Sequence, residues 1–151
     1  LVRHPRCVSA VDDFAGSFRR LLADPKLLAR DGVRRVLLCS GKICYELEDE
    51  REKRRADDVA IVRLEQLYPL QASDLEAALA PYPAHAGVLW VQEEPENAGA
   101  WRFLHARFGE HIAGRAFRGL QRRASASPAT GSSASHKLEQ QAILERAFAA
   151  N

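Results

Sequence analysis

Methionine is missing from this 151-residue sequence. A chain without a start residue is most simply explained as part of a longer one, and we expect a fragment of a multidomain protein. No apolar run approaches the roughly 20 residues that cross a bilayer. The first six residues also lack the apolar core that follows the basic start of a signal peptide. We therefore expect no membrane as a partner.

A strong charge of one sign is also missing. The sequence contains 22 basic and 20 acidic residues, which leaves a net charge of +2 at pH 7. Proteins that bind nucleic acids or anionic membranes through electrostatic attraction carry a larger positive excess, so we expect no nucleic acid as a partner either. Hydrophobic residues make up 46% of the chain, enough for a globular domain with a buried core.

Cysteine and histidine are too scattered for a disulfide scaffold or a metal centre. The three cysteines, Cys7, Cys39 and Cys44, form no C-x-x-C pair, and their number is odd. The five histidines lack the H-E-x-x-H spacing of zinc enzymes. The P-loop, the dinucleotide-binding G-x-G-x-x-G and the G-x-S-x-G elbow of hydrolases are absent as well. We predict no catalytic residue and no metal ligand in this chain.

Apolar runs alternate with helical patterns from residue 33 onward. Strands are expected at 33–38, 59–64, 87–92 and 117–124, and helices at 42–56, 73–80, 98–108 and 135–149. Ser73 and Ser135 are the predicted N-caps of two of these helices, and the charge run in the helix 42–56 is interpreted as a solvated face. This alternation predicts an α/β domain with three αβα layers, in which helices cover both faces of a mostly parallel, twisted sheet.

Residues 1–32 are expected to be a lead-in segment to this core. A helical stretch is predicted from Phe14 to Leu22, and Asp24-Pro25 favours a turn after it. Residues 33–151 then form the alternating core, so that residues 1–151 make a single domain.

The turns after the predicted strands contain the candidate binding residues. Ser40 to Lys42 stands between a strand and a helix, where free backbone N–H groups and the charge of Lys42 favour an anion. Arg118, Arg122 and Arg123 would extend that positive charge. We predict contacts to a phosphorylated effector from Ser40, Lys42, Arg122 and Arg123. The alternatives are a turn without a ligand and arginines scattered over the surface.

A second set of turn residues is interpreted as structural or as part of a subunit interface. Arg63 and Glu65 lie on the same side of an extended chain, which favours an ion pair. Glu93 and Glu94 are adjacent, so they point in opposite directions and do not form an acid–base couple. One of the two is expected to cap a helix or to pair with an arginine. The full set is Arg63, Glu65, Glu93, Glu94, Asn97 and Trp101.

Taken in order, these turns resemble one known family. The matching segments are Cys39–Lys42, Val59–Pro69, Gln92–Pro95 with Asn97, Gly99, Ala100 and Trp101, Arg123 with Ser125, Ser127, Pro128 and Ala129, and His136 with Glu139 and Gln140. Their order and spacing, over almost the whole chain, are similar to the C-terminal domain of the thiamine-diphosphate-dependent decarboxylating subunit of 2-oxoglutarate dehydrogenase. That domain is transketolase C-terminal-domain-like.

The resemblance implies an enzyme subunit that oxidatively decarboxylates 2-oxoglutarate on thiamine diphosphate with magnesium. It then transfers the succinyl group to lipoyl groups in the citric acid cycle. The family's G-D-G…N-N motif, which holds the pyrophosphate and magnesium, is absent here. This chain is therefore expected to bind no cofactor and to serve as a structural, dimer-interface or regulatory domain that is inactive alone.

The resemblance also implies partners and a regulator. The partners are the remaining domains of the same subunit, a second copy in a homodimer, and the lipoyl-bearing succinyltransferase component. Some bacterial members of the family are activated by acetyl-CoA, which directs attention to Lys42 and to Arg122 and Arg123. The abundance of arginine and alanine points to a bacterial source with GC-rich DNA, hence a cytoplasmic protein, or a mitochondrial matrix protein if the source is eukaryotic.

An independent nucleotide- or CoA-binding α/β module is the alternative. In that hypothesis the loops at one sheet edge, with Ser40 to Lys42, form the ligand site. A Lys42→Ala variant would then bind a phosphorylated ligand more weakly.

Overall fold

A six-stranded sheet forms the centre of the computed structural model, which describes residues 7–8, 10–26, 30–127 and 129–149. The strand order is β1-β3-β2-β4-β6-β5. The strands are β1 (Leu21–Leu22), β2 (Arg35–Cys39), β3 (Val59–Leu64), β4 (Gly87–Pro95), β5 (His111–Ile112) and β6 (Arg115–Arg122). The neighbours β3, β2, β4 and β6 run parallel, whereas β1 and β5 are antiparallel to theirs. The prediction of a mostly parallel sheet is confirmed.

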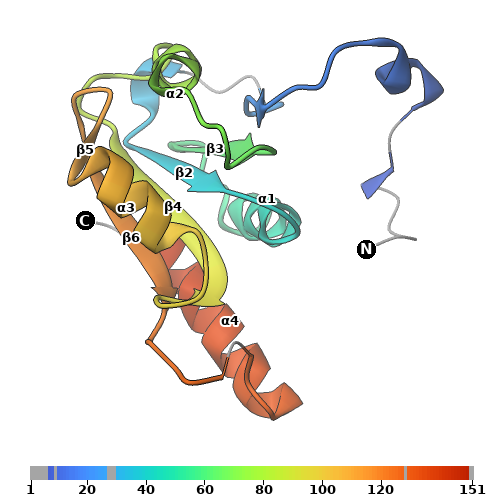
Figure 1. The fold of residues 1–151 in the computed structure, drawn as a ribbon, viewed down its shortest axis with the longest axis vertical. Coiled ribbons are helices and arrows are strands. Elements are labelled where there is room, and N and C mark those ends of the chain that lie inside the picture. Colours follow the sequence, from blue (N-terminus) through green and yellow to red (C-terminus); the bar gives the residue numbers. More distant parts are fainter. Residues whose placement is uncertain (1–6, 9, 27–29, 128, 150–151) are drawn as a thin grey trace.

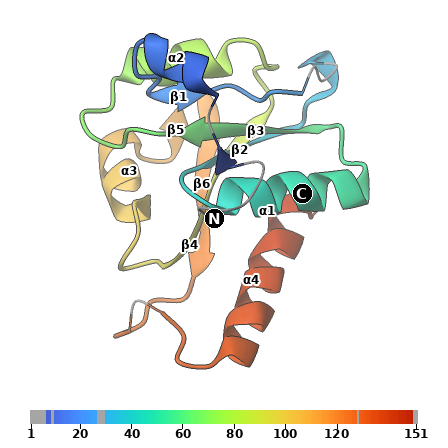
Figure 2. The same cartoon turned by 90° about the vertical axis from the view of Figure 1, so that its right-hand side faces the viewer.

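Helices cover both faces of this sheet, as predicted (Figures 1 and 2). The α-helices are α1 (Ile43–Arg54), α2 (Ala72–Leu79), α3 (Trp101–Phe108) and α4 (Ser133–Phe148). The 3-10 helices η2 (Val11–Ala15) and η3 (Arg30–Gly32) lie in the described part of the lead-in segment. Within the described residues, no helix is both long and apolar enough to cross a membrane.

The alternation of side chains along β2 divides the core into two parts. Val36 and Leu38 belong to a buried cluster that includes residues of α2 and α3. Leu37 and Cys39 face the opposite side and pack with residues of α1 and α4. Because both faces are covered, β2 consists of a continuous apolar run, as is typical of strands in parallel sheets.

The connections between the strands create a switch point between β2 and β4. From β2 the chain passes through α1 to β3 on one side, and from β3 it passes through α2 to β4 on the other side. In open α/β sheets, ligands bind outside the carboxyl ends of two such strands. The loop after β2 and the end of β4 therefore meet where a site is expected.

The lead-in segment does not contain the helix that was predicted from Phe14 to Leu22. A 3-10 helix ends at Ala15, and β1 pairs Leu21 with Leu64 of β3. Phe14 and Phe18 are exposed, so a helix here would have no apolar surface of the described chain against which to pack. The edge of β3 instead provides backbone hydrogen-bond partners for the segment.

Both predicted serine N-caps are wrong. The helix α2 begins at Ala72 after an extended Gln71, which places Ser73 inside the first turn. The helix α4 begins at Ser133, and the hydroxyl of Ser132 accepts from the Ser135 N–H at 3.4 Å. Several polar residues stand near each helix start, and a cap requires an extended backbone just before the first turn. Sequence alone does not show which residue has that backbone.

A buried ion pair fastens the lead-in segment to the sheet. The two terminal guanidinium nitrogens of Arg51 in α1 donate to the carboxylate of Asp24, and these side chains are 1% and 2% exposed. The same carboxylate accepts from the Ile61 N–H of β3 at 2.7 Å. Arg51 lies in the charge run that was interpreted as a solvated face, so that interpretation is wrong for this residue.

Candidate functional site

Lys42 joins the two loops at the switch point. A turn with Gly41 at φ +70° places Lys42 as the N-cap residue of α1. Its Nζ lies 2.5 Å from Glu93 Oε1 in β4 and 3.4 Å from Glu46 Oε1 in α1. Burial by itself lowers the pKa of Lys42, but the hydrogen bond and charge of Glu93 outweigh burial and raise it. Lys42 is therefore a stable cation that neutralises two carboxylates.

A polar chain continues from Lys42 to α4 and β6. The second oxygen of Glu46 accepts from Gln140 Nε2 of α4 at 2.8 Å. Gln140 Oε1 in turn accepts from Arg122 Nη2 of β6 at 3.1 Å. Gln140 is buried, and buried polar groups that are fully paired hold neighbouring elements in one arrangement. The loop after β2 is thus coupled physically to the end of β6.

Arg122 is the centre of the second half of this polar chain. Its Nη2 lies 3.0 Å from His136 Nδ1. Because a guanidinium only donates, Nδ1 is the acceptor and the proton of a neutral His136 is on Nε2. Arg122 Nε lies 3.4 Å from Glu139 Oε2, an ion pair without an aligned hydrogen bond, so this buried N–H has no acceptor. Arg122 also contacts the Thr130 hydroxyl at 3.5 Å.

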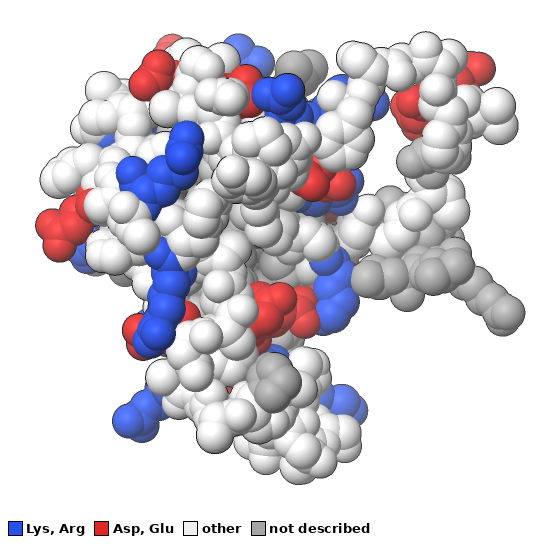
Figure 3. Space-filling view, in the orientation of Figure 1, with Lys and Arg blue, Asp and Glu red and all other residues white. Residues whose placement is uncertain are grey.

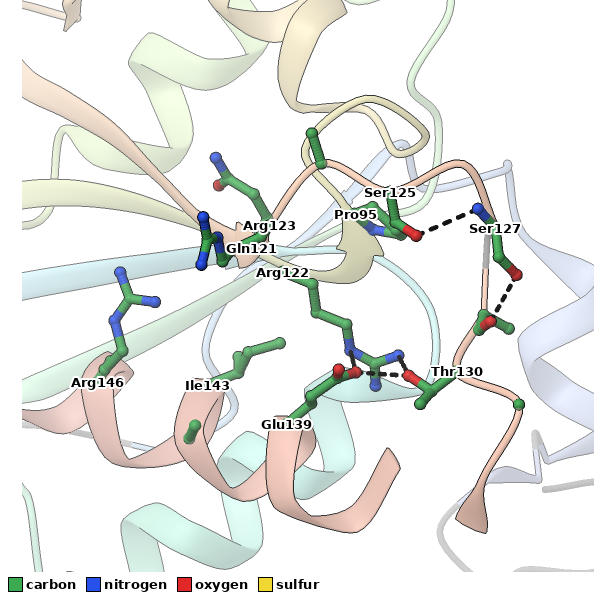
Figure 4. Close-up of a pocket in the computed structure, with 14 residues that line it drawn as sticks. Pro95, Gln121, Arg122, Arg123, Ser125, Ser127, Thr130, Glu139, Ile143 and Arg146 are labelled. Carbon is green, nitrogen blue, oxygen red and sulfur yellow. Dashed lines mark hydrogen bonds and ion pairs between the residues drawn. The ribbon is translucent and has the colours of Figure 1, made fainter. Parts of the chain in front are cut away.

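A cleft of about 540 Å³ opens beside Arg122, between the loop after β6 and α4. Figure 4 shows Arg122 reaching toward Glu139 and Thr130, while Arg146 projects from α4. The lining residues are Pro95, Gln121, Arg122, Arg123, Ala124, Ser125, Ser127, Ala129, Thr130, Gly131, Glu139, Ala142, Ile143 and Arg146. Its volume lies within the range of small-ligand pockets, and its charge is mainly positive.

The structure places the four predicted effector residues in two groups. Arg122 and Arg123 both line the cleft. Ser40, which is half-buried, and Lys42 lie in the turn after β2 and do not line it. Lys42 is connected to Arg122 in the cleft through Glu46 and Gln140. Sequence reasoning missed Gln140 as the connecting residue.

Arg63 and Glu65 form the ion pair that was predicted from their sidedness. Arg63 Nε lies 2.5 Å from Glu65 Oε1 at the end of β3. Arg63 also donates to the Tyr45 hydroxyl at 3.0 Å and lies over the Tyr45 ring. Burial lowers the pKa of Arg63, but Tyr45 and Glu65 outweigh burial and raise it. The contacts of Arg63 with Tyr45 therefore tie β3 to α1.

The remaining motif residues hold the loop between β4 and α3. Glu93 is turned toward Lys42, whereas Glu94 is exposed, as expected for neighbours in a strand. The partner of Glu93 is a lysine, so the prediction of an arginine partner or a helix cap is wrong. The Asn97 side chain donates to Ser125 O at 2.8 Å and accepts from Ser125 N–H at 3.0 Å. Asn97 thereby joins this loop to the loop after β6.

Gln92 is the first residue of one of the matching segments, and the sequence alone did not reveal its structural role. Its Oε1 accepts from Trp90 Nε1 and from the Trp101 N–H, both at 2.8 Å, and its Nε2 donates to Glu94 O and Pro95 O. A Cβ on Gly99 would lie 2.2 Å from Gln92 Nε2. The Gln92 side chain therefore requires glycine at 99, and the motif around it builds the start of α3.

Trp101 packs at the edge of the core, which confirms one of its two predicted placements. Its ring lies 5.4 Å from the Phe117 ring and 5.0 Å from the His105 ring, between centroids. Part of the indole covers Gly119 of β6, because a Cβ there would lie 2.4 Å from Trp101 Cδ2.

We expect Gly119→Ala to lower the free energy of unfolding by about 1–3 kcal/mol, because the added methyl forces the indole out of its place. Urea denaturation measures this change. Gly87→Ala is the matched control: Gly87 is also a strand glycine, and its added Cβ meets nothing within 4 Å. Equal losses in both variants would contradict the assigned role of Trp101.

The geometry defines a doubly wound α/β domain whose switch point is closed by ion pairs. Among the described residues, no group of three or more His, Cys, Asp or Glu side chains could hold a metal ion. Glu93 and Glu46, the carboxylates at the switch point, are both held by Lys42. The residues present do not fit a thiamine diphosphate–magnesium site, and no catalytic step is derived from them.

Comparison with known proteins identifies the family. The chain belongs to the 2-oxoglutarate dehydrogenase C-terminal family, whose sequence profile matches residues 8–148. A 2-oxoglutarate dehydrogenase E1 component from Cupriavidus necator is 42% identical over 99% of the chain and 16% of its own length. A Brucella anthropi protein of the same name is 42% identical over 98% of the chain and 16% of its own length.

A third relative is a multifunctional 2-oxoglutarate metabolism enzyme from a Mycobacterium species (strain KMS), 43% identical over 99% of the chain and 12% of its own length. The chain thus spans about a sixth or less of the curated relatives that it matches. The resemblance inferred from the turns is confirmed.

Proposed function

We propose that this chain is the C-terminal domain of a decarboxylating subunit of 2-oxoglutarate dehydrogenase. The complete subunit would oxidatively decarboxylate 2-oxoglutarate on thiamine diphosphate with magnesium and pass the succinyl group to a lipoyl group. The observation that carries the proposal is the family match over residues 8–148, together with 42% identity to an E1 component across 99% of the chain.

Within that subunit, the domain would act as a scaffold and would leave the cofactor to other domains. The ion pairs of Lys42 and the hydrogen bonds of Gln92 and Asn97 support this role, because the motif side chains bind one another. A second copy of the subunit and a lipoyl-bearing succinyltransferase would be its partners. We place the protein in the cytoplasm of a bacterium, in agreement with its bacterial relatives.

The lead-in segment supplies a surface for the remaining domains. Val8, Val11, Phe14 and Phe18 are between 66% and 85% exposed, and Figure 3 shows this segment standing away from the body of the molecule. Exposed apolar side chains gathered in one segment are typical of interaction surfaces. We propose that they pack on the part of the subunit that precedes this domain.

A chimeric enzyme tests the proposed function. The matching C-terminal part of the Cupriavidus necator E1 component is replaced by this chain, and decarboxylation of 2-oxoglutarate is measured. We expect an active enzyme, and we expect the 151-residue chain alone to bind no thiamine diphosphate in calorimetry. A chimera that folds and dimerises but shows no activity would overturn the proposal, and tight cofactor binding by the chain alone would overturn the scaffold role.

A regulatory function for the cleft is favoured by one specific observation. The buried Nε–H of Arg122 has no aligned acceptor, and Arg122 lines the cleft beside Arg123. An anionic group could accept from these donors in charge-assisted hydrogen bonds. We propose that the cleft takes the phosphates of a CoA-type or nucleotide effector, either in the complete subunit or in an independent binding module.

Acetyl-CoA is the probe for this cleft. Arg123→Ala is expected to weaken its binding about tenfold, because a charge-assisted hydrogen bond contributes roughly 1.5–3 kcal/mol. Lys42→Ala is expected to weaken binding less, through the chain Glu46–Gln140–Arg122. Calorimetry measures both affinities. An unchanged affinity in Arg123→Ala would contradict the proposal, and an unchanged affinity in Lys42→Ala would remove Lys42 from the site.

A further inference from the structure

A second positively charged hollow lies beside the carboxyl-terminal half of α4, over β4 and β6. This groove has a volume of about 490 Å³. Its lining residues are Arg35, His85, Gly87, Val88, Leu89, Ala116, Arg118, Gly119, Leu120 and Arg146. Leu120 belongs to the core cluster shared with α1 and α4, and the partly buried Leu89 packs against that cluster. The groove therefore has an apolar floor and lies on that face of the sheet.

Three arginines from three different elements line the groove. Arg35 comes from β2, Arg118 from β6 and Arg146 from α4. No acidic side chain is among the described residues that line it. Within the described part of the chain, Arg118 and Arg146 also have no ion-pair partner. On the face drawn in Figure 3, by contrast, basic and acidic side chains are interspersed.

Arg35 is the least exposed of the three arginines. It is half-buried, and its Nη1 donates to Ala147 O of α4 at 2.7 Å, which fixes its position. Burial and the charge of the neighbouring Arg34 lower the pKa of Arg35 from its ordinary value. These two effects outweigh the charge of Asp58, which raises the pKa, so an anion in the groove would stabilise the charged form of Arg35.

We propose that this groove binds a small anion with three or more negative charges, held by Arg35, Arg118 and Arg146 over the apolar floor. Guanidinium groups match carboxylates and phosphates in planar, two-bonded geometry. The groove's volume fits a small molecule rather than a folded partner. Both polycarboxylates and phosphorylated compounds have the required chemistry, so the test includes one of each.

The groove is distinct from the cleft beside Arg122, and substitutions of two different arginines distinguish the two. Of these two hollows, Arg118 lines the groove, Arg123 lines the cleft, and Arg146 lines both. Arg118 also lines a neighbouring hollow beside Trp101. The inference also stands apart from the proposed enzyme function, because it rests only on the residues of the groove. A failed chimera would leave it unaffected.

Calorimetry on the 151-residue chain, with citrate and inorganic tripolyphosphate as probes, tests the proposal at low salt. We expect a dissociation constant of about 1 mM or tighter for one of them, which corresponds to roughly 4 kcal/mol. Arg118→Gln should weaken binding about tenfold, because it removes charge-assisted hydrogen bonds. Arg102→Gln, which replaces an exposed arginine outside both hollows, should leave the affinity unchanged, and Arg123→Gln, which alters the cleft but not the groove, reports any binding at the cleft.

The probes distinguish the ligand classes. Tighter binding of citrate assigns the groove to polycarboxylates, and tighter binding of tripolyphosphate assigns it to phosphorylated compounds. The proposal is overturned if neither binds at about 10 mM, well above the millimolar affinity expected of such a site. It is also overturned if the glutamine variants at 118, 123 and 102 all weaken binding equally, because the anion then responds only to net charge. Loss of binding in Arg123→Gln alone would move the anion to the cleft.

Discussion

Asp24→Ala is expected to lower the free energy of unfolding by about 3–5 kcal/mol, because it leaves the buried guanidinium of Arg51 without its partner. The Ile61 N–H loses its acceptor at the same time. A domain of this size is typically stable by about 5–15 kcal/mol, so the loss is a large fraction of the total. Urea denaturation, followed by circular dichroism, measures the change.

The double variant Asp24→Ala with Arg51→Met is the matched control. Replacing both members of a buried ion pair by apolar residues often costs little, since neither charge then remains buried alone. We expect the double variant to be clearly more stable than Asp24→Ala. If it is equally unstable, the cost comes from the Ile61 N–H or from lost packing, and the ion pair does not fasten the lead-in segment as described.

Arg115→Ala is expected to destabilise the domain by about 3 kcal/mol, since it removes four hydrogen bonds and leaves the Tyr82 and Ala113 oxygens without their donor. The Arg115 guanidinium donates to Leu79 O at the end of α2, to Tyr82 O and Pro83 O in the following turn, and to Ala113 O. Arg115 thus ties the end of α2 and the turn after it to β6. Urea denaturation again measures the loss.

Arg118→Ala on the same strand provides the comparison. Arg118 is exposed and lies only three positions further along β6, so its substitution should change the stability by no more than about 0.5 kcal/mol. Arg115→Met retains apolar stem contacts but donates no hydrogen bond. If Arg115→Met is as stable as the parent chain, the carbonyl contacts do not carry the effect.

The central strands could be predicted because each carries its own signal. Val59–Leu64 is apolar except for Arg63, and the structure forms β3 over the same residues. The strands β1 and β5 were missed because each has only two residues, and pairing with a neighbour alone defines them. Helix starts were misplaced by a few residues, because the cap depends on backbone angles that adjacent serines do not reveal.

The candidate site was predictable in its loops but not in its pairings. The turn from Ser40 to Lys42 and the residues Arg122 and Arg123 lie at the carboxyl edge of the sheet, as their positions after strands indicate. The ion pair between Lys42 and Glu93 could not be inferred, because adjacent strands bring together residues that are remote in sequence. For the same reason, the sequence pattern does not distinguish Gln140 and Arg51 from the exposed polar residues of a surface helix.

By itself, the sequence determined the family, the alternating α/β class and the two-sided burial of the sheet. Those properties depend on apolar patterns and local motifs that can be read along the chain. Only the tertiary structure decided which charges are neutralised and which face a cavity. Lys42 and Arg63 are held by glutamates, whereas Arg118 and Arg146 line a groove without an acid among the described residues. Charge pairing acts over a few ångströms in space, and distance along the chain does not predict it.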